Sequence, residues 1–209
     1  MRGGKALLRF ERALLVLGLV LTAVSAAARI QGQISAHLAI QNFDAAPLES
    51  AQDVDTSLWS VQRIREYMES LTTKTDPPLA ILRIPKLRLE VPVYDGTDDW
   101  TLNRGAGRII GTARLGDLGN TGIAGHRDGF FRGLKDIGTG DTLELTTPDG
   151  TERYVVTQIQ ITTPDDVSVL RPTATSSLTL VTCYPFYFVG SAPQRYIVHA
   201  SISNAKSSD

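Results

Sequence analysis

The pattern of apolar and polar positions divides the chain into three parts: an uncharged segment near the start, a helical stretch and a long series of short strands. Apolar residues recur every three or four positions in the helical stretch, which is the spacing of one helix face. These residues are Leu58, Val61, Ile64, Met68 and Leu71. The pair Pro77 and Pro78 cannot continue a helix, so we place a domain boundary after residue 78.

From residue 79 onward, β-branched and apolar runs alternate with Gly, Pro, Asp and Asn, as is typical of strands joined by turns. Strands are predicted at 80–84, 87–94, 122–126, 141–147, 153–161, 177–183 and 194–202. Asp149 and Gly150 predict a tight hairpin, because Asp-Gly tolerates positive φ angles. The segments 98–104 and 130–134 are long enough for a helical turn each. Because long helices are missing between the runs, we predict an all-β domain over 79–203, an antiparallel barrel or sandwich with short helices, followed by a polar tail at 204–209.

The first 29 residues carry a targeting pattern. Four basic residues precede an uncharged run at 13–28, which is slightly shorter than the roughly 17–25 residues of a spanning helix. The basic residues are Arg2, Lys5, Arg9 and Arg12. This order favours a retained signal-anchor, a single transmembrane helix with everything after Arg29 on the extracytoplasmic side. A cleavable signal peptide is the alternative, because Ser25 and the alanines at 26–28 fit a cleavage site. The stretch 30–78 is then an extracytoplasmic linker with an amphipathic helix.

Charge and cysteine content narrow the function. The chain has 21 Lys and Arg against 22 Asp and Glu, a net charge of −1, so it lacks the positive field that drives nucleic-acid binding. It contains one cysteine, so an internal disulfide is impossible. Cys183 is therefore either a packing residue or the reactive atom of the protein.

Three residues at predicted strand ends suggest thiol chemistry. Cys183 ends one strand and His126 ends another, and Arg195 opens the last one. A histidine beside a cysteine can accept its proton and activate it as a nucleophile. The forked cation of an arginine can stabilise an oxyanion. A lone cysteine in a strand is more often a small buried hydrophobe, which leaves a noncatalytic, membrane-tethered binding barrel as an alternative.

The residues around these positions resemble a known family. The segment LVTCYP at 180–185, followed by Arg195, and the segment GNTGIAGHR at 119–127 resemble those of sortases, which are membrane-anchored cysteine transpeptidases. The resemblance extends over about 80–202 and includes IPKL at 84–87 and VPV at 91–93. The length of the Cys-to-Arg loop and the aromatic residues after Cys183 are most similar to class D sortases.

The resemblance implies an eight-stranded sortase-like β-barrel with Cys183 as nucleophile, His126 as general acid and base, and Arg195 as the stabilising cation. Thr182 is implied to help shape the substrate groove. The implied reaction cleaves an LPxTG-like sorting signal of an exported protein between Thr and Gly, through a thioacyl intermediate. An amine of a peptidoglycan precursor or a pilin then accepts the acyl group. We predict no cofactor, and the charge balance already argues against a nucleic-acid partner.

Other features receive no chemical role. The acidic residues at 98–99, 128 and 165–166 are dispersed and do not form an oxygen-ligand loop, so we predict no metal site and expect them to cap turns. His37 and His199 match no functional position of the family. An L,D-transpeptidase is the closest enzymatic alternative, but its Ser-His-Gly-Cys motif differs from the Leu-Val-Thr that precedes Cys183.

Overall fold

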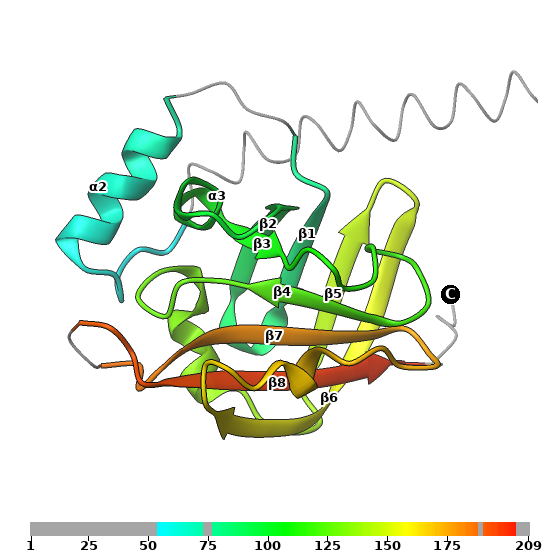
Figure 1. Cartoon of the computed structure of the whole chain (residues 1–209). Helices are drawn as coiled ribbons and strands as arrows, with labels where there is room; N and C mark the ends of the chain where they lie inside the picture. The colour runs from blue at the N-terminus through cyan, green and yellow to red at the C-terminus, as the bar shows by residue number, and fades with distance from the viewer. Residues whose placement is uncertain (1–53, 73–76, 188–189, 204–209) are drawn as a thin grey trace, which may run out of the picture. The chain divides into compact units, whose positions relative to one another are not determined.

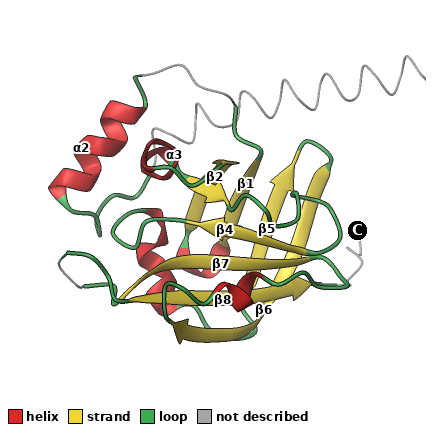
Figure 2. Cartoon of the chain, in the orientation of Figure 1, coloured by secondary structure: helices red, strands yellow, loops and turns green. Residues whose placement is uncertain are grey.

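The computed structural model describes residues 54–72, 77–187 and 190–203. The sequence segments predicted as a signal-anchor and a polar tail, and His37, lie outside these residues. Within the described part the structure contains one helix before the sheet, eight strands and several short helical turns (Figures 1 and 2). The elements are α2 (Val61–Ser70), β1 (Ala80–Ile84), η1 (Pro85–Leu87), β2 (Leu89–Asp95), α3 (Asp99–Arg104), β3 (Ala106–Arg108), β4 (Asn120–Ala124), η2 (Phe130–Asp136), β5 (Thr142–Thr147), β6 (Gly150–Thr162), η3 (Val167–Leu170), β7 (Ser177–Tyr184) and β8 (Gln194–Ile202).

The strands close into a barrel in the order β1-β2-β3-β4-β7-β8-β6-β5, so the predicted eight-stranded barrel with short helices is confirmed. The expected antiparallel pairing is wrong at two places. β2 pairs with β3, and β4 with β7, in parallel. Parallel neighbours need a crossover connection, and here α3 joins β2 to β3 while β5 and β6 intervene between β4 and β7. The parallel pairing of β4 with β7 creates the candidate site.

All seven predicted strands occur, with their ends shifted by a few residues. The prediction missed β3, because its three residues Ala-Gly-Arg carry no β-branched or aromatic side chain. It also extended β4 to His126, whereas β4 ends at Ala124. The hairpin between β5 and β6 is confirmed, with Pro148 and Asp149 as its loop and Gly150 at φ 142°, paired with Thr147.

The barrel interior is filled by alternate residues of every long strand, because successive side chains of a strand point to opposite faces. On β7 the inward residues are Leu178 and Leu180, both essentially inaccessible to solvent. Equivalent core residues on the other strands include Leu82, Ile84, Val91, Val93, Ile123, Leu143, Leu145, Tyr154, Val156 and Val198. This packed interior gives the strand ends a rigid base on which reactive side chains can be held.

Helix α2 forms where the apolar spacing predicted a helix. Its first turn is capped by Ser60, whose hydroxyl oxygen accepts a hydrogen bond from the Arg63 backbone amide at 3.2 Å. The face it buries differs from the predicted stripe: Val61 is 76% exposed and Met68 56%, whereas Tyr67 is 3% exposed. The apolar spacing predicted the helix but not the face that it buries. That face is set by the Tyr67 ring, which packs against Phe130, and not by the aliphatic residues Val61 and Met68.

Aromatic side chains attach α2 to the rest of the described structure. Trp59 packs edge-on against Phe130, the first residue of η2, with ring centroids 4.8 Å apart. Tyr67 contacts the same ring at 5.7 Å and Trp59 at 5.5 Å. Such aromatic pairs each contribute about 0.5–1.5 kcal/mol beyond the area that they bury. The helix is thereby held next to the segment that follows β4.

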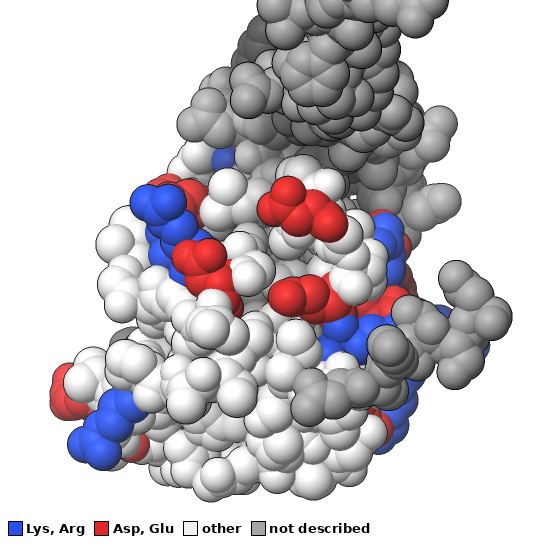
Figure 3. All heavy atoms as spheres, turned by 90° about the vertical axis from the view of Figure 1, so that its right-hand side faces the viewer, with Lys and Arg blue, Asp and Glu red and all other residues white. Residues whose placement is uncertain are grey.

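The surface carries both signs of charge in small groups. On the face shown in Figure 3, the acidic and basic side chains form small groups, and uncharged surface separates one group from the next. Ion pairs such as Arg83 with Glu90 and Arg153 with Glu144 join neighbouring strands on the outside of the barrel. Among the residues described, no helix is long and apolar enough to cross a membrane.

Candidate active site

Strand register brings the three predicted catalytic residues to one level of the barrel. In the parallel β4–β7 pair, Ala124 lies opposite Val181, and the Gly125 amide continues the pairing by donating to the Val181 carbonyl at 3.1 Å. Two residues beyond Ala124 is His126, which follows the end of β4, and two residues beyond Val181 is Cys183, which lies on β7. On the other side of β7, Cys183 pairs directly with Arg195 of β8. Cys183 and Arg195 therefore lie opposite each other on adjacent strands, and His126 follows the end of β4, the neighbour of β7 on its other side.

The nucleophile candidate and the arginine face the same way. Residues directly opposite each other in an antiparallel pair project from the same face of the sheet. Cys183 and Arg195 are both partly exposed, whereas Thr182 is buried at 2% exposure with Leu178 and Leu180 below it on β7. Both side chains thus project from the outer face of the sheet and are partly exposed.

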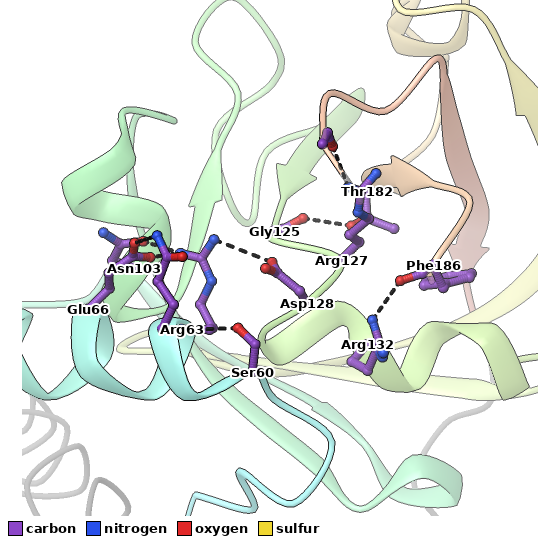
Figure 4. A network of polar contacts seen from close by, with 12 residues as sticks. Ser60, Arg63, Glu66, Asn103, Gly125, Arg127, Asp128, Arg132, Thr182 and Phe186 are labelled. Atoms are coloured by element: carbon purple, nitrogen blue, oxygen red, sulfur yellow. Dashed lines mark hydrogen bonds and ion pairs between the residues drawn. The ribbon is translucent and has the colours of Figure 1, made fainter. Parts of the chain in front are cut away.

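Thr182 ties the two strands together directly beside the site. Its hydroxyl donates a hydrogen bond to the Gly125 carbonyl oxygen at 2.7 Å. Gly125 immediately precedes His126 and Thr182 immediately precedes Cys183, so this bond ties together the backbone segments that carry the two residues (Figure 4 labels Gly125 and Thr182). Thr182 is 2% exposed, so any influence on a substrate comes through the Gly125 backbone that its hydroxyl holds.

Gly125 is required by close packing. A Cβ at this position would lie 2.7 Å from Cδ2 of Phe131, whose ring is fully buried. The chain then turns, because the His126 carbonyl accepts hydrogen bonds from the amides of Gly129 and Phe131, both at 3.2 Å. The turn and the buried ring fix the path of the backbone through His126.

The imidazole of His126 is largely shielded from solvent. Its Nε2 atom is buried and has no hydrogen-bond partner among the described residues. Burial lowers the pKa of His126 below its usual value, and the Arg63 cation on α2 lowers it further. Three carboxylates act in the opposite direction: Asp128, Asp99 and Glu66. An imidazole with an unpaired, buried nitrogen is suited to accept and return a proton.

Arginines hold the loop that connects β7 to β8. The Arg195 Nη1 donates to the carbonyls of Ala192 at 3.4 Å and Gln194 at 3.1 Å. From the other side of the site, Arg127 donates to the Gly190 carbonyl at 2.7 Å and Arg132 to the Phe186 carbonyl at 2.6 Å. The loop after Cys183 is thus tied both to its own last residues and to the segment after His126.

The acidic residues and the histidine to which the sequence assigned no chemistry make contacts that stabilise the fold. Asp98 caps α3 by accepting from the Thr101 amide, and Asp166 caps η3 by accepting from the Ser168 amide, as expected for turn-capping acids. His199 lies on β8 with Nδ1 3.1 Å from the Thr179 hydroxyl. Within the ranges described, no group of three or more His, Cys, Asp or Glu is arranged to hold a metal ion.

Sequence reasoning missed two neighbours of the site. Arg63 and Asp128 form an ion pair at 3.3 Å beside His126, although one lies on α2 and the other follows β4. The position of Asp128, two residues after a candidate catalytic histidine, could have indicated that its carboxylate lies near the imidazole. Nothing in the sequence of α2 distinguishes the partly buried Arg63 from the exposed Arg65.

Comparison with known proteins agrees with this geometry. The sortase domain family matches residues 82–203, more than half of the chain. Sortase D of Bacillus subtilis (strain 168) is 35% identical over 131 residues, covering 62% of this chain and 66% of the relative. Sortase A of Streptococcus agalactiae serotype III is 29% identical over 148 residues, covering 66% of this chain and 58% of the relative. The chain thus spans less than two thirds of the length of either relative.

A solved structure shows the same fold. The Clostridium perfringens Sortase D5 transpeptidase superposes with a TM-score of 0.57 and 25% identity, covering 78% of this chain and 99% of that one. The match argues against an L,D-transpeptidase, because family, fold and the order of His126 before Cys183 all agree with one assignment. The chain belongs to the sortase family of cysteine transpeptidases.

Proposed function

We propose that this protein is a membrane-anchored, class D-like sortase. It cleaves an LPxTG-like sorting signal between Thr and Gly and transfers the exported protein to an amine of the cell envelope or of a pilin. The observation that supports the proposal is the strand register of a sortase-family barrel, which pairs Cys183 of β7 with Arg195 of β8 and sets the end of β4, two residues before His126, beside β7.

The chemistry follows from the three side chains. His126 takes the proton of the Cys183 thiol, and the thiolate attacks the carbonyl carbon of the threonine. Arg195 stabilises the oxyanion that develops on the carbonyl oxygen. His126 then returns the proton to the leaving glycine nitrogen, so the C–N bond breaks and a thioester remains on Cys183. An acceptor amine attacks this thioester, forms the new amide and regenerates the thiol.

Membrane attachment is the second part of the proposal. The basic residues before position 13 and the uncharged run at 13–28 support a single spanning helix with the barrel on the extracytoplasmic side. Retention at the membrane surface would keep Cys183 near exported substrates that carry a C-terminal apolar stretch. The acceptor amine belongs to a peptidoglycan precursor or to a pilin lysine.

The test uses the full chain in detergent with an LPxTG-containing peptide. Intact mass should show an acyl group on Cys183 that hydrolyses slowly, because a transpeptidase positions an amine better than water. Adding acceptors that end in Gly, Ala, diaminopimelate or Lys should raise turnover and convert the product from acid to amide. Cys183→Ala should abolish turnover and leave the fold intact.

Two results would contradict the proposal. Undiminished turnover by Cys183→Ala would exclude the thiol mechanism and would support the noncatalytic reading of Cys183. An acyl-enzyme that no acceptor of the panel intercepts would make the protein a sorting-signal protease.

A further inference from the structure

Arg63 of α2 reaches from the helix to α3 and to the segment that follows β4. Its side chain is 14% exposed. It forms an ion pair with Glu66 at 2.8 Å and with Asp128 at 3.3 Å, and Nη1 donates to the Asn103 side-chain oxygen on α3 (Figure 4). The guanidinium therefore joins α2, α3 and the segment after β4.

The arginine stem and the histidine lie on either side of one glycine. A Cβ on Gly129 would be 3.5 Å from both Arg63 Cδ and His126 Cβ. Gly129 is buried and the Arg63 side chain is 14% exposed, whereas the Asp128 side chain is 40% exposed. Charges at partly buried positions such as Arg63 interact more strongly with their neighbours than they would in water.

The packing of α2 fixes where Arg63 stands. Trp59 and Tyr67 flank Arg63 in the sequence, and both pack on the Phe130 ring. Phe130 directly follows Gly129, so the aromatic cluster and the arginine hold the same short segment. The contact is a built part of the fold and not a surface charge that happens to lie near the site.

We propose that Arg63 is a positioning residue for His126, and that docking of α2 completes the catalytic centre by keeping Asp128 in an ion pair. This inference rests on the proposed role of His126 in proton transfer. An Asp128 carboxylate without its partner would stabilise the imidazolium and make it a weaker acid toward the leaving amine. With Arg63 in place, His126 returns the proton to that amine more readily.

Every charged group that faces His126 contributes to this balance. Arg63 and Glu66 come from α2, Asp99 from α3 and Asp128 from the segment after β4. Cys183 of β7 pairs with Arg195 of β8, beside the end of β4 that leads to His126. Removal of Arg63 leaves three carboxylates unopposed by this cation, so the pKa of His126 should rise. Removal of the Asp128 charge should lower it.

The opposite signs separate this role from a merely structural one. If substitutions only loosened the packing, water would enter in both variants. Both would then raise the pKa of His126 toward its usual value, because burial is the largest cause of its depression. A His126 pKa that rises when the Arg63 charge is removed and falls when the Asp128 charge is removed therefore reports the effect of the charges.

The experiment is a histidine NMR titration of the full chain in detergent. The chain has three histidines, so the His126 signals can be assigned by their loss in His126→Asn. Arg63→Met should raise the pKa of His126 by about half a unit or more, and Asp128→Asn should lower it. Arg63→Lys should stay near wild type, because it keeps the charge. Arg65→Met is the matched control, since Arg65 is exposed on the same helix, and should leave the pKa unchanged.

Peptide turnover supplies the second readout. The acidic limb of the kcat/KM profile should move to higher pH in Arg63→Met and stay in place in Arg65→Met. An unmoved His126 pKa in Arg63→Met, or a rise in both Arg63→Met and Asp128→Asn, would overturn the inference while peptide turnover continued. Failure of the proposed function would look different, because the unmodified chain would then not process the peptide at all.

Discussion

The hydrogen bond from Thr182 to the Gly125 carbonyl offers a direct test of how the site is held in register. Thr182→Val replaces the hydroxyl with a methyl group of nearly the same size at a position that is 2% exposed. The change therefore creates almost no cavity, and its main effect is to leave the buried Gly125 carbonyl without this donor.

Leaving a buried acceptor unsatisfied costs about 1–3 kcal/mol. For a domain of this size each kcal/mol lowers Tm by about 2–4 °C, so Thr182→Val should lower Tm by roughly 2–12 °C. Turnover should fall as well, because Gly125 carries His126 and its height relative to Cys183 is no longer fixed. The loss should be in kcat more than in KM, since the groups affected do chemistry.

Two further variants make the measurement specific. Thr182→Ser keeps the hydroxyl and loses one buried methyl group, so it should cost about 0.5–1.5 kcal/mol and retain most of the turnover. Thr151→Val is the matched control, because the Thr151 hydroxyl bonds the Thr146 hydroxyl at 3.0 Å on the exposed surface. It should change the free energy of unfolding by less than about 0.5 kcal/mol.

The assay combines urea unfolding with peptide turnover for all three variants. The reasoning is refuted if Thr182→Val keeps wild-type stability and turnover. It is also refuted if Thr182→Ser loses as much turnover as Thr182→Val, since the hydrogen bond would then not be what matters.

Three other predictions follow from the same geometry. Arg195→Lys keeps the charge but loses the planar fork, so kcat should fall by about tenfold or more in the peptide assay, and wild-type kcat would exclude a role for the fork. Gly125→Ala should cost about 1–3 kcal/mol in urea unfolding because its Cβ would meet the Phe131 ring at 2.7 Å, whereas Gly133→Ala, whose nearest contact is 3.9 Å away, should cost less. Burial lowers the pKa of His199, so on acidification the unfolded chain binds a proton at about pH 6.5, before the folded chain does. The free energy of unfolding should therefore fall as the pH drops from about 6.5 toward the folded-state pKa. His199→Gln should make this fall smaller between about pH 7.5 and 5.5, and an unchanged fall would show that His199 does not cause it.

Most of the barrel could be predicted from local patterns. Runs such as 177–183 and 194–202 are long, β-branched and bounded by turn residues, and both are strands in the structure. The short strand β3 and the parallel pairing of β4 with β7 could not be predicted this way. Pairing partners are set by the closure of the whole barrel, which no single segment of sequence encodes.

The helix α2 shows a different limit. Its apolar spacing was sufficient to predict a helix, but the face with Val61 and Met68 is mostly exposed. The buried face is defined by Tyr67 and by an arginine whose charge is compensated by Asp128 and Glu66. A charged residue counts as surface in any pattern of hydrophobicity, so the sequence does not show that the Arg63 side chain is only 14% exposed and pairs with Asp128 of a distant segment.

The candidate site illustrates why residue types alone could not prove that His126, Cys183 and Arg195 belong to one active site. His126, Cys183 and Arg195 are far apart in the chain, and their alignment depends on one parallel and one antiparallel register, both centred on β7. Because side chains alternate along β7, Cys183 faces Arg195 on the outside while Thr182 faces inward and bonds the strand that leads to His126. The residue before the nucleophile is therefore constrained by the position of the histidine and not by the thiol itself. A shift of β7 by one residue would exchange the two faces, burying the thiol and separating it from both partners at once.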